Sequence, residues 1–160
     1  MSLASALGAI ERRAFGAARS KYKTQAGLVQ SRAELEAIAA RWTALEERVA
    51  GTELFQSLGW ARAVYDFEAS RGNAAFDPVI ATLEDGRRLV AILPLERVRS
   101  GARTVLVPLG HAFGQVSDLL MAPEVDARDG MRQLLRTAID AAPSDAVGFY
   151  KVREGSALYC

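Results

Sequence analysis

The sequence predicts a mixed α/β (α+β) domain with a mainly antiparallel sheet flanked by helices. Apolar residues recur at helical intervals over 31–50 and again over 57–72, a pattern typical of amphipathic helices. Further along, an Asp-Gly pair separates two β-rich runs, which indicates a hairpin. A helical pattern over 131–142 then precedes a β-rich run at 146–152. Because a helix between two strands of one sheet favours a crossover, we expect part of the sheet to be parallel.

The size and composition of the chain limit the possible classes. A length of 160 residues suffices for one compact domain. The net charge of +1 gives no field that would attract nucleic acid, and no apolar run approaches the roughly 18 residues of a transmembrane helix. The single cysteine, Cys160, excludes an internal disulfide and a zinc cluster. We therefore expect a cytoplasmic protein with no metal, no transmembrane segment and no nucleic-acid partner.

Residues 1–27 differ from the rest and are expected to form a basic helical or flexible N-terminal extension, with the folded domain over 28–160. Apolar residues at roughly helical intervals alternate with basic ones, and Glu11 is the only acid among the first 25 residues. A basic amphipathic helix would make weak contact with a membrane surface. The alternative is a frayed extension with a solvated charged face. The mixture of small and basic residues also resembles an organellar transit peptide.

The first two helices carry recognisable start and stop signals. Ser31 followed by Glu34 has the spacing of a capping box, and the helix is expected to continue to Gly51. Ser57 is expected to cap a second helix that ends at Gly72. The large apolar residues of the two helical faces are Leu35, Ile38, Trp42, Leu45, Val49, Trp60, Val64 and Phe67.

Around the start of the second helix, two interpretations remain. In the first, the tryptophans are core anchors and the neighbouring side chains are structural. In the second, Phe55, Gln56 and Trp60 line a ligand groove, with the indole N–H or the amide reaching a polar group of the ligand.

A three-stranded antiparallel meander is expected to follow the helices. Residues 79–83 and 89–93 form the hairpin, and residues 104–109 form the third strand. Pro94 has no N–H to donate, which predicts an edge or a bulge in the second strand at that point.

The loop that follows, residues 110–118, contains the only histidine of the chain. His111 could act as a general base, with Ser117 or Asp118 orienting it or binding a substrate group. Alternatively, the loop simply turns the chain, and Asp118 bonds nearby backbone amides. A hydrolase triad is rejected, because the sequence lacks a Gly-x-Ser-x-Gly elbow. Residues 118–121 are expected to extend the sheet before the helix over 131–142.

The order helix, helix, three strands, helix, strand resembles the GNAT acyltransferase fold. Short motifs narrow the resemblance to the N-terminal half of a bacterial family with two tandem GNAT-like halves, which is labelled by its cellulose-biosynthesis member CelD and is similar in architecture to FemAB-type aminoacyl transferases. The motifs are Trp42-Thr43-Ala44-Leu45, Phe55-Gln56-Ser57 with Trp60, Leu93-Pro94-Leu95, Leu109-Gly110, Ser117-Asp118-Leu119-Leu120 and Arg153-Glu154-Gly155-Ser156-Ala157-Leu158.

The resemblance implies a GNAT-like domain that is incomplete at its C-terminus and non-catalytic alone. The full enzyme would transfer an acyl group from acetyl-CoA or another acyl-CoA, held by the second half, to an amine or hydroxyl acceptor. The acceptor cleft would be lined by Phe55, Gln56, Trp60, His111, Ser117 and Asp118. The partner would be the missing C-terminal half, or a second copy paired through the open sheet edge. A truncated pseudo-enzyme or a stand-alone binding module is the alternative.

One local departure from the family pattern concerns the cofactor. A GNAT domain that binds CoA holds the pyrophosphate in a glycine-rich loop at a helix start. Residues 121–130 contain a single glycine, Gly130, and three acidic residues. Glu124, Asp126 and Asp129 would repel a pyrophosphate, although ordinary helix capping also accounts for them. We therefore expect this half to bind no CoA.

Overall fold

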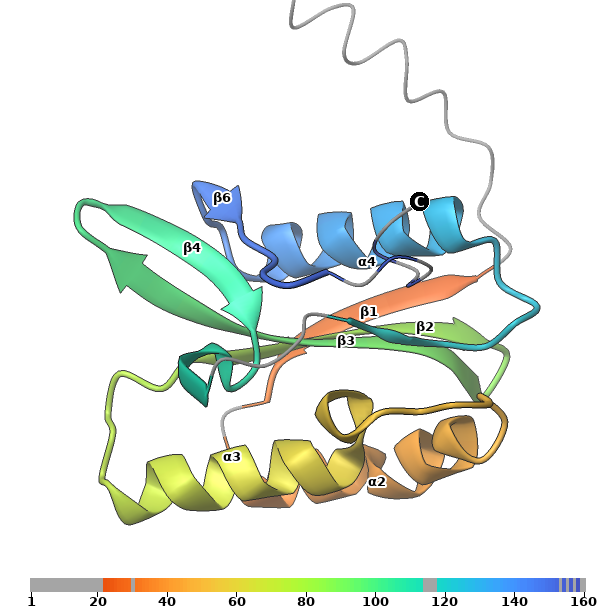
Figure 1. Ribbon diagram of the computed structural model, residues 1–160, viewed down its shortest axis with the longest axis horizontal. Coiled ribbons are helices and arrows are strands. Elements are labelled where there is room, and N and C mark those ends of the chain that lie inside the picture. The colour runs from red at the N-terminus through yellow and green to blue at the C-terminus, as the bar shows by residue number, and fades with distance from the viewer. Residues whose placement is uncertain are drawn as a thin grey trace, which may run out of the picture.

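The protein is a six-stranded sheet covered by helices on both faces (Figure 1). The computed structural model describes residues 22–29, 31–113, 118–152, 154, 156 and 158. The strands are β1 Lys23–Leu28, β2 Pro78–Asp85, β3 Arg88–Ser100, β4 Arg103–Pro108, β5 Leu120–Met121 and β6 Ala146–Val147. The helices are α2 Arg32–Glu46, α3 Leu58–Ser70 and α4 Ala127–Ala141, with 3₁₀ turns η1 Leu54–Gln56 and η2 His111–Phe113.

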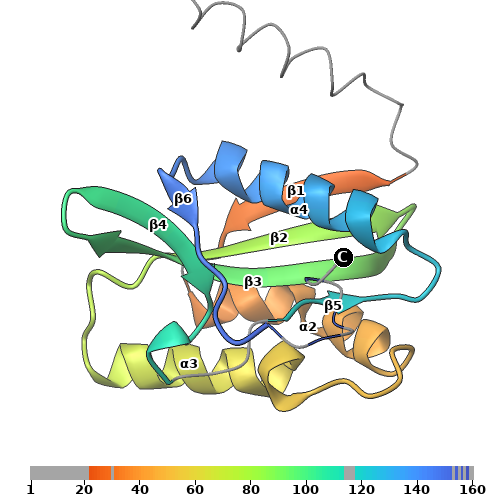
Figure 2. The same ribbon diagram turned by 45° about the horizontal axis from the view of Figure 1, so that its top comes forward.

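The predicted mixed, mainly antiparallel architecture is confirmed. The strand order is β1-β2-β3-β4-β6, and β5 pairs with β3. All neighbouring strands are antiparallel except β4 and β6, which are parallel. Helices α2 and α3 lie on one face of the sheet and α4 on the other, as the two views show (Figures 1 and 2).

The start signals of the first two helices are confirmed. The Ser31 hydroxyl accepts the N–H of Glu34 at 3.2 Å, and the Glu34 carboxylate accepts the N–H of Ser31 at 3.0 Å. Ser57 caps α3 in the same way, accepting the N–H of Trp60 at 3.0 Å. Both helices stop slightly earlier than the apolar pattern predicts: α2 ends at Glu46 and α3 at Ser70. These caps satisfy amide donors that a helix start would otherwise leave without partners.

Of the edge or bulge predicted at Pro94, the bulge is wrong, but one side of β3 does lack a paired strand at this residue. β2 and β3 stay in register past Pro94, which faces Ile80, and their register shift lies between Leu83 and Glu84. Pro94 is tolerated because the other edge of β3 changes partner there: β5 pairs up to Ile92, and β4 pairs from Leu95. The proline therefore lies at a point of β3 where neither β4 nor β5 pairs with it, so its missing N–H breaks no hydrogen bond between strands.

A strand was missed near the N-terminus. Residues 23–28, which the sequence analysis placed mostly in the extension, form β1 and pair antiparallel with β2 from Lys23 opposite Glu84 to Leu28 opposite Val79. The segment is Lys-Thr-Gln-Ala-Gly-Leu, with one β-branched residue, so its propensity gave no strand signal. The basic helix predicted for the extension falls on residues 1–21, outside the described part of the chain.

The last predicted strand is shorter than expected. Only Ala146 and Val147 pair with β4, and one further backbone bond runs from the Gly148 N–H to the Leu106 carbonyl at 2.8 Å. Lys151 then has a φ of +51°, which is incompatible with extended backbone. The parallel crossover through α4 is confirmed, but the strand at 146–152 is reduced to two residues.

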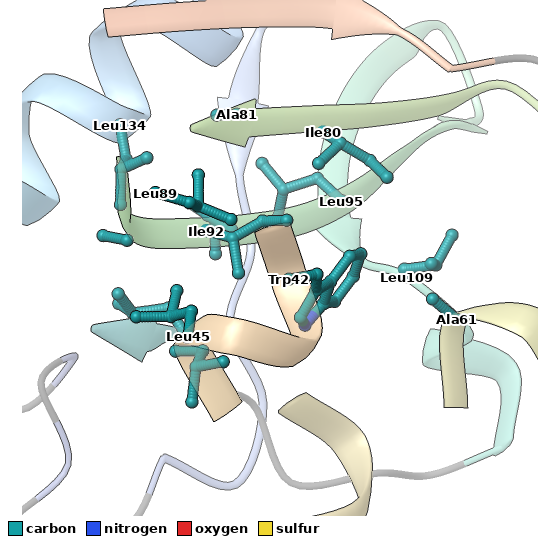
Figure 3. Packing of buried hydrophobic residues seen from close by; sticks show 14 of the residues in the cluster. Trp42, Leu45, Ala61, Ile80, Ala81, Leu89, Ile92, Leu95, Leu109 and Leu134 are labelled. Carbon is teal, nitrogen blue, oxygen red and sulfur yellow. The ribbon is translucent and has the colours of Figure 1, made fainter. Parts of the chain in front are cut away.

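The core lies between the sheet and helices α2 and α3, with a second layer beneath α4. Trp42 is completely buried and points toward β3, where Ile92 and Leu95 lie (Figure 3). Its indole N–H donates to the Gln56 carbonyl at 3.1 Å, so its polar atom is satisfied. Leu134 of α4 fills the opposite side of the sheet. Burial of such apolar side chains is the main stabilising term for a domain of this size.

Helices in the described ranges are all too short or too polar to cross a lipid bilayer.

Candidate functional site

The site begins where one strand of the sheet is interrupted. If β4 continued in register beyond Pro108, residue 111 would face Ile92 of β3. Leu120 of β5 faces Ile92 instead, nine residues further along the chain. β4 and β5 therefore occupy the same edge of β3, and the chain leaves that edge after Pro108 and rejoins it at Leu120. Such an excursion is an extreme form of bulge, a device that moves side chains out of the regular ladder.

Gly110 makes the exit from the sheet possible. Its φ of +81° is a conformation that L side chains rarely adopt. A Cβ atom there would also lie 2.8 Å from Val64 Cγ2 and 2.9 Å from Trp60 Cζ2, so α3 packs directly on its backbone. The Trp60 indole N–H donates to the Leu109 carbonyl at 3.1 Å. The excursion is thus held against α3 by shape and by one hydrogen bond.

Glu96 of β3 fixes the first residues of the excursion. Its Oε1 accepts the backbone N–H of Gly110 at 2.9 Å and that of His111 at 3.1 Å, and it lies 2.7 Å from His111 Nδ1. Because the same oxygen accepts both amides, Nδ1 is the proton donor of the third bond. In the neutral ring, the remaining nitrogen, Nε2, then carries the lone pair. This arrangement leaves the imidazole oriented as a hydrogen-bond acceptor or base.

His111 lies in a cleft of about 670 Å³. The cleft is bounded by the C-terminal end of α3, the connection to β2, the β3–β4 hairpin and η2. The His111 side chain is 32% exposed and that of Glu96 is 11% exposed, so the pair forms the floor of the cleft. The other lining residues are Glu68, Arg71, Asn73, Ala75, Phe76, Asp77, Arg97, Val98, Arg99, Thr104, Gly110, Ala112 and Phe113. A volume of this size is typical of small-molecule sites.

One ion pair builds the wall of the cleft. Arg97 Nη2 lies 2.6 Å from Asp77 Oδ2, Nε donates to the same oxygen at 2.7 Å, and the Arg97 N–H donates to the Asp77 carbonyl at 2.8 Å. Three bonds between the same two residues lock the connection before β2 onto β3. Arg97 is therefore occupied by a structural role.

Aromatic rings form one side of the opening. Phe113 makes edge contacts with Trp60 at 5.6 Å and with Phe67 at 5.1 Å between ring centroids. Phe113 is 46% exposed and Phe67 is 40% exposed, so both rings face solvent beside the cleft. The Arg71 guanidinium lies over the Phe67 ring, 5.3 Å from its centroid. This cation–π contact places the positive charge of Arg71 next to the opening.

The residues predicted around the start of α3 have structural partners. The Gln56 amide accepts the N–H of Glu53 at 2.8 Å and donates to the Leu119 carbonyl at 2.8 Å. Phe55 packs edge-on against Trp60 with centroids 5.1 Å apart. None of Phe55, Gln56 and Trp60 lines the cleft, although Trp60 supports Phe113 from behind. Their substrate-binding role stays a prediction.

The predicted loop residues divide into three cases. His111 lines the cleft, as expected for a functional side chain. Asp118 accepts the backbone N–H of Leu119 at 2.8 Å, which is the capping role considered as an alternative, and it does not line the cleft. Ser117 lies outside the described residues.

The acidic segment before α4 serves the helix itself. Asp126 is the N-cap and accepts the N–H of Asp129 at 2.8 Å, while Asp129 accepts from the Gln133 amide at 2.6 Å. Glu124 lies 3.0 Å from Arg88 of β3. Two carboxylates thus lie at the positive end of the helix dipole, where an anionic ligand would have to compete with them.

The most important partner of His111, Glu96, was not predicted from the sequence. Glu96 follows the apolar run Leu93-Pro94-Leu95, and an acid that continues a buried strand is a signal for a carboxylate with a specific partner. The partner itself could not be identified, because 15 residues separate Glu96 from His111. No sequence motif marks Arg71, Arg99 or Phe113 as residues of a site.

Comparisons with protein-family models, with curated proteins and with solved structures find no match for this chain. Nor do the described residues bring together three or more His, Cys, Asp or Glu side chains that could hold a metal ion.

Proposed function

We propose that this chain is the acceptor-binding half of a GNAT-type acyltransferase, with the cleft around His111 as the acceptor site. The order of its elements, a strand, two helices, three antiparallel strands, a short fourth strand, a helix and a parallel strand, contains the predicted order and supports the resemblance on which the proposal rests. The observation that carries it is the pair of Glu96 and His111 on the cleft floor, 2.7 Å apart.

The pair is suited to removing one proton from an acceptor. With Nδ1–H bonded to Glu96, His111 Nε2 would accept the proton that an amine or hydroxyl loses as it forms its bond to an acyl carbon. Glu96 would stabilise the imidazolium formed in that step, without changing its own position. An acyl-CoA held by the second half would supply the acyl group: the acceptor forms its bond to the acyl carbon, the C–S bond breaks, and CoA leaves as a thiolate that takes up the proton from the imidazolium. Glu96 is in this scheme a positioning residue and His111 the base.

The start of α4 supports the absence of CoA binding by this half. Asp126 already caps the helix and Asp129 occupies its first turn, so a pyrophosphate placed there would meet two negative charges. We therefore assign acetyl-CoA or a related acyl-CoA to the second half alone.

The proposal includes a partner and a compartment. A second GNAT-like half, or a second copy of this chain, would pair with an edge of the sheet, since β1 has one neighbour among the described strands. Single-cysteine composition fits a reducing cytoplasm. The weak membrane contact predicted for the basic extension stays a prediction.

Nuclear magnetic resonance of the histidine ring tests the acceptor site. The chain has one histidine, so its ring signals need no assignment. Titration with glycylglycinamide, a small primary amine, is expected to shift the His111 signals in a saturable way, whereas N-acetylglycinamide, which lacks the amine, is expected to leave them unchanged. Equal shifts with both compounds, or no shift with either, would contradict the proposal that the cleft binds the acceptor amine.

Calorimetry with acetyl-CoA tests the division of labour between the halves. The expected result is no heat beyond dilution. Binding with a dissociation constant in the micromolar range, about −8 kcal/mol, would show that the acids before α4 do not exclude the cofactor. A stand-alone binding module would also show no binding of acetyl-CoA. In that alternative, however, ligand binding would not depend on a free amine.

A further inference from the structure

We infer that the acceptor is a zwitterion, a small molecule that carries a carboxylate as well as the reacting amine, as a free amino acid or a short peptide does. This inference rests on the proposed function and names the substrate class of the same cleft. Its basis is the separation of charge within the cleft, with a carboxylate on the floor and two arginines without carboxylate partners at the opening.

The floor favours an amine. Glu96 is the buried acid of the cleft, and with a neutral imidazole beside it the floor keeps one negative charge. A protonated amine would be attracted to the floor by that charge. It would release one proton to solvent there, and the neutral amine would give a second proton to His111 as its bond to the acyl carbon forms. Of the other acids of the cleft, Asp77 pairs with Arg97, whereas Glu68 accepts from the neutral Asn73 amide at 2.5 Å and adds a second negative charge to the lining.

The opening favours a carboxylate. Arg71 and Arg99 are exposed residues of the cleft lining, and neither lies within ion-pair distance of an acid in the described ranges. Arg71 lies against the Phe67 ring, which limits the freedom of its side chain. Guanidinium groups bind carboxylates through two parallel hydrogen bonds, so an exposed guanidinium of the lining can hold one carboxylate, and this lining offers two of them.

The size of the cleft limits the acceptor to a small molecule or a chain end. A volume of about 670 Å³ accommodates a dipeptide but not a folded partner. Because the two charges of the ligand would contact the floor and the opening at the same time, a compound with only one of them should bind less tightly.

Three matched compounds test the inference with the unmodified protein. Glycylglycine has both charges, glycylglycinamide lacks the carboxylate and N-acetylglycine lacks the amine. From the His111 ring signals we expect glycylglycine to bind about tenfold more tightly than glycylglycinamide, as the loss of a partly exposed charge contact implies. N-acetylglycine is expected to bind more weakly than glycylglycine as well.

Paired variants locate the carboxylate site. In the double variant Arg71→Gln/Arg99→Gln, glycylglycine is expected to bind no better than glycylglycinamide. Arg128→Gln is the matched control, because Arg128 is an exposed residue of α4 outside the cleft and should leave the tenfold preference intact. All three arginines are exposed, so the circular dichroism spectra should match that of the unmodified protein.

The outcomes separate this inference from the proposed function. Equal affinity for glycylglycine and glycylglycinamide would contradict the inference that the acceptor carries a carboxylate, but not the proposal that the cleft binds an amine. A preference that survives in the double variant would overturn the role of the two arginines. Failure of both amines to shift the His111 signals would overturn the proposed function and the inference together.

Discussion

The two halves of β3 differ in almost every physical respect. From Leu89 to Leu95 every residue is buried, and the strand is paired on one edge with β2 and on the other with β5 or β4. From Glu96 onward the exposure increases step by step, and the β3–β4 hairpin extends beyond the end of α4 (Figures 1 and 2). The first half is apolar and the second carries Glu96, Arg97 and Arg99.

This difference shows how one strand serves both stability and chemistry. The buried half anchors the two helical layers and leaves no polar side chain to react. The other half begins where the partner strand departs at Gly110, and that departure places an imidazole beside the first acid of the strand. The site therefore depends on the buried half for rigidity but uses none of its side chains.

The largest effect is expected in the buried half. Ile92→Ala removes a completely buried side chain and should lower the free energy of unfolding by about 2–5 kcal/mol. Val98→Ala, in the other half, removes a partly exposed side chain and should cost less than about 1 kcal/mol. Urea unfolding measures both. Equal losses would mean that the two halves of β3 do not differ in packing.

The exit of the chain from the sheet should be the next most sensitive point. Gly110→Ala places a Cβ against Val64 and Trp60 in a backbone conformation that disfavours alanine, and should cost about 1–3 kcal/mol. The His111 ring signals should shift as well, because the clash moves the chain away from Glu96. Ser100→Ala, at the exposed tip of the hairpin, is the matched control and should change neither quantity.

Folding stability should depend on pH through Tyr65, a buried tyrosine of α3. Burial, with a smaller contribution from Glu34, raises the pKa of the Tyr65 hydroxyl, which donates to the Val29 carbonyl. The folded state holds this proton more tightly than the unfolded state, so the stabilisation is complete below the usual tyrosine pKa of about 10 and declines as the pH rises above it.

Thermal unfolding measured between about pH 8 and pH 11, a range that includes the pKa of an unperturbed tyrosine, tests this effect. The unmodified chain should lose stability with rising pH more steeply than Tyr65→Phe, which has no proton to lose. Parallel pH profiles for the two proteins would show that Tyr65 does not couple folding to proton release.

The smallest effect is expected at the opening of the cleft. Arg99→Gln removes an exposed side chain without an ion-pair partner in the described ranges, so the free energy of unfolding should change by less than about 0.5 kcal/mol. A loss of more than 1 kcal/mol (about twice that bound) would reveal a structural role for Arg99 and would weaken the contrast between a stabilising half and a binding half.

Sequence-based prediction succeeded where the determining interactions are local. The caps at Ser31 and Ser57 join residues three apart, and the β2–β3 turn is set by neighbouring residues. Features that depend on distant partners were missed. β1 has no strand propensity of its own and exists through pairing with β2.

The site followed the same rule. His111 was a visible candidate because it is the only histidine in a glycine-containing loop. Its partner Glu96 and the unpaired arginines became evident only from the tertiary structure, since the excursion between β4 and β5 brings η2 over the second half of β3. The tolerance of Pro94 has the same origin, because no local pattern indicates a change of partner strand.

The tautomer of His111 tests the central claim most directly. The nitrogen chemical shifts of a neutral imidazole distinguish a ring protonated on Nδ1 from one protonated on Nε2, and the single histidine makes the spectrum unambiguous. For the neutral form of the ring, we predict protonation on Nδ1 in the unmodified chain and a mixture of both tautomers in Glu96→Gln. A neutral ring protonated mainly on Nε2 in the unmodified chain would show that Glu96 does not orient His111, and would contradict the site described above.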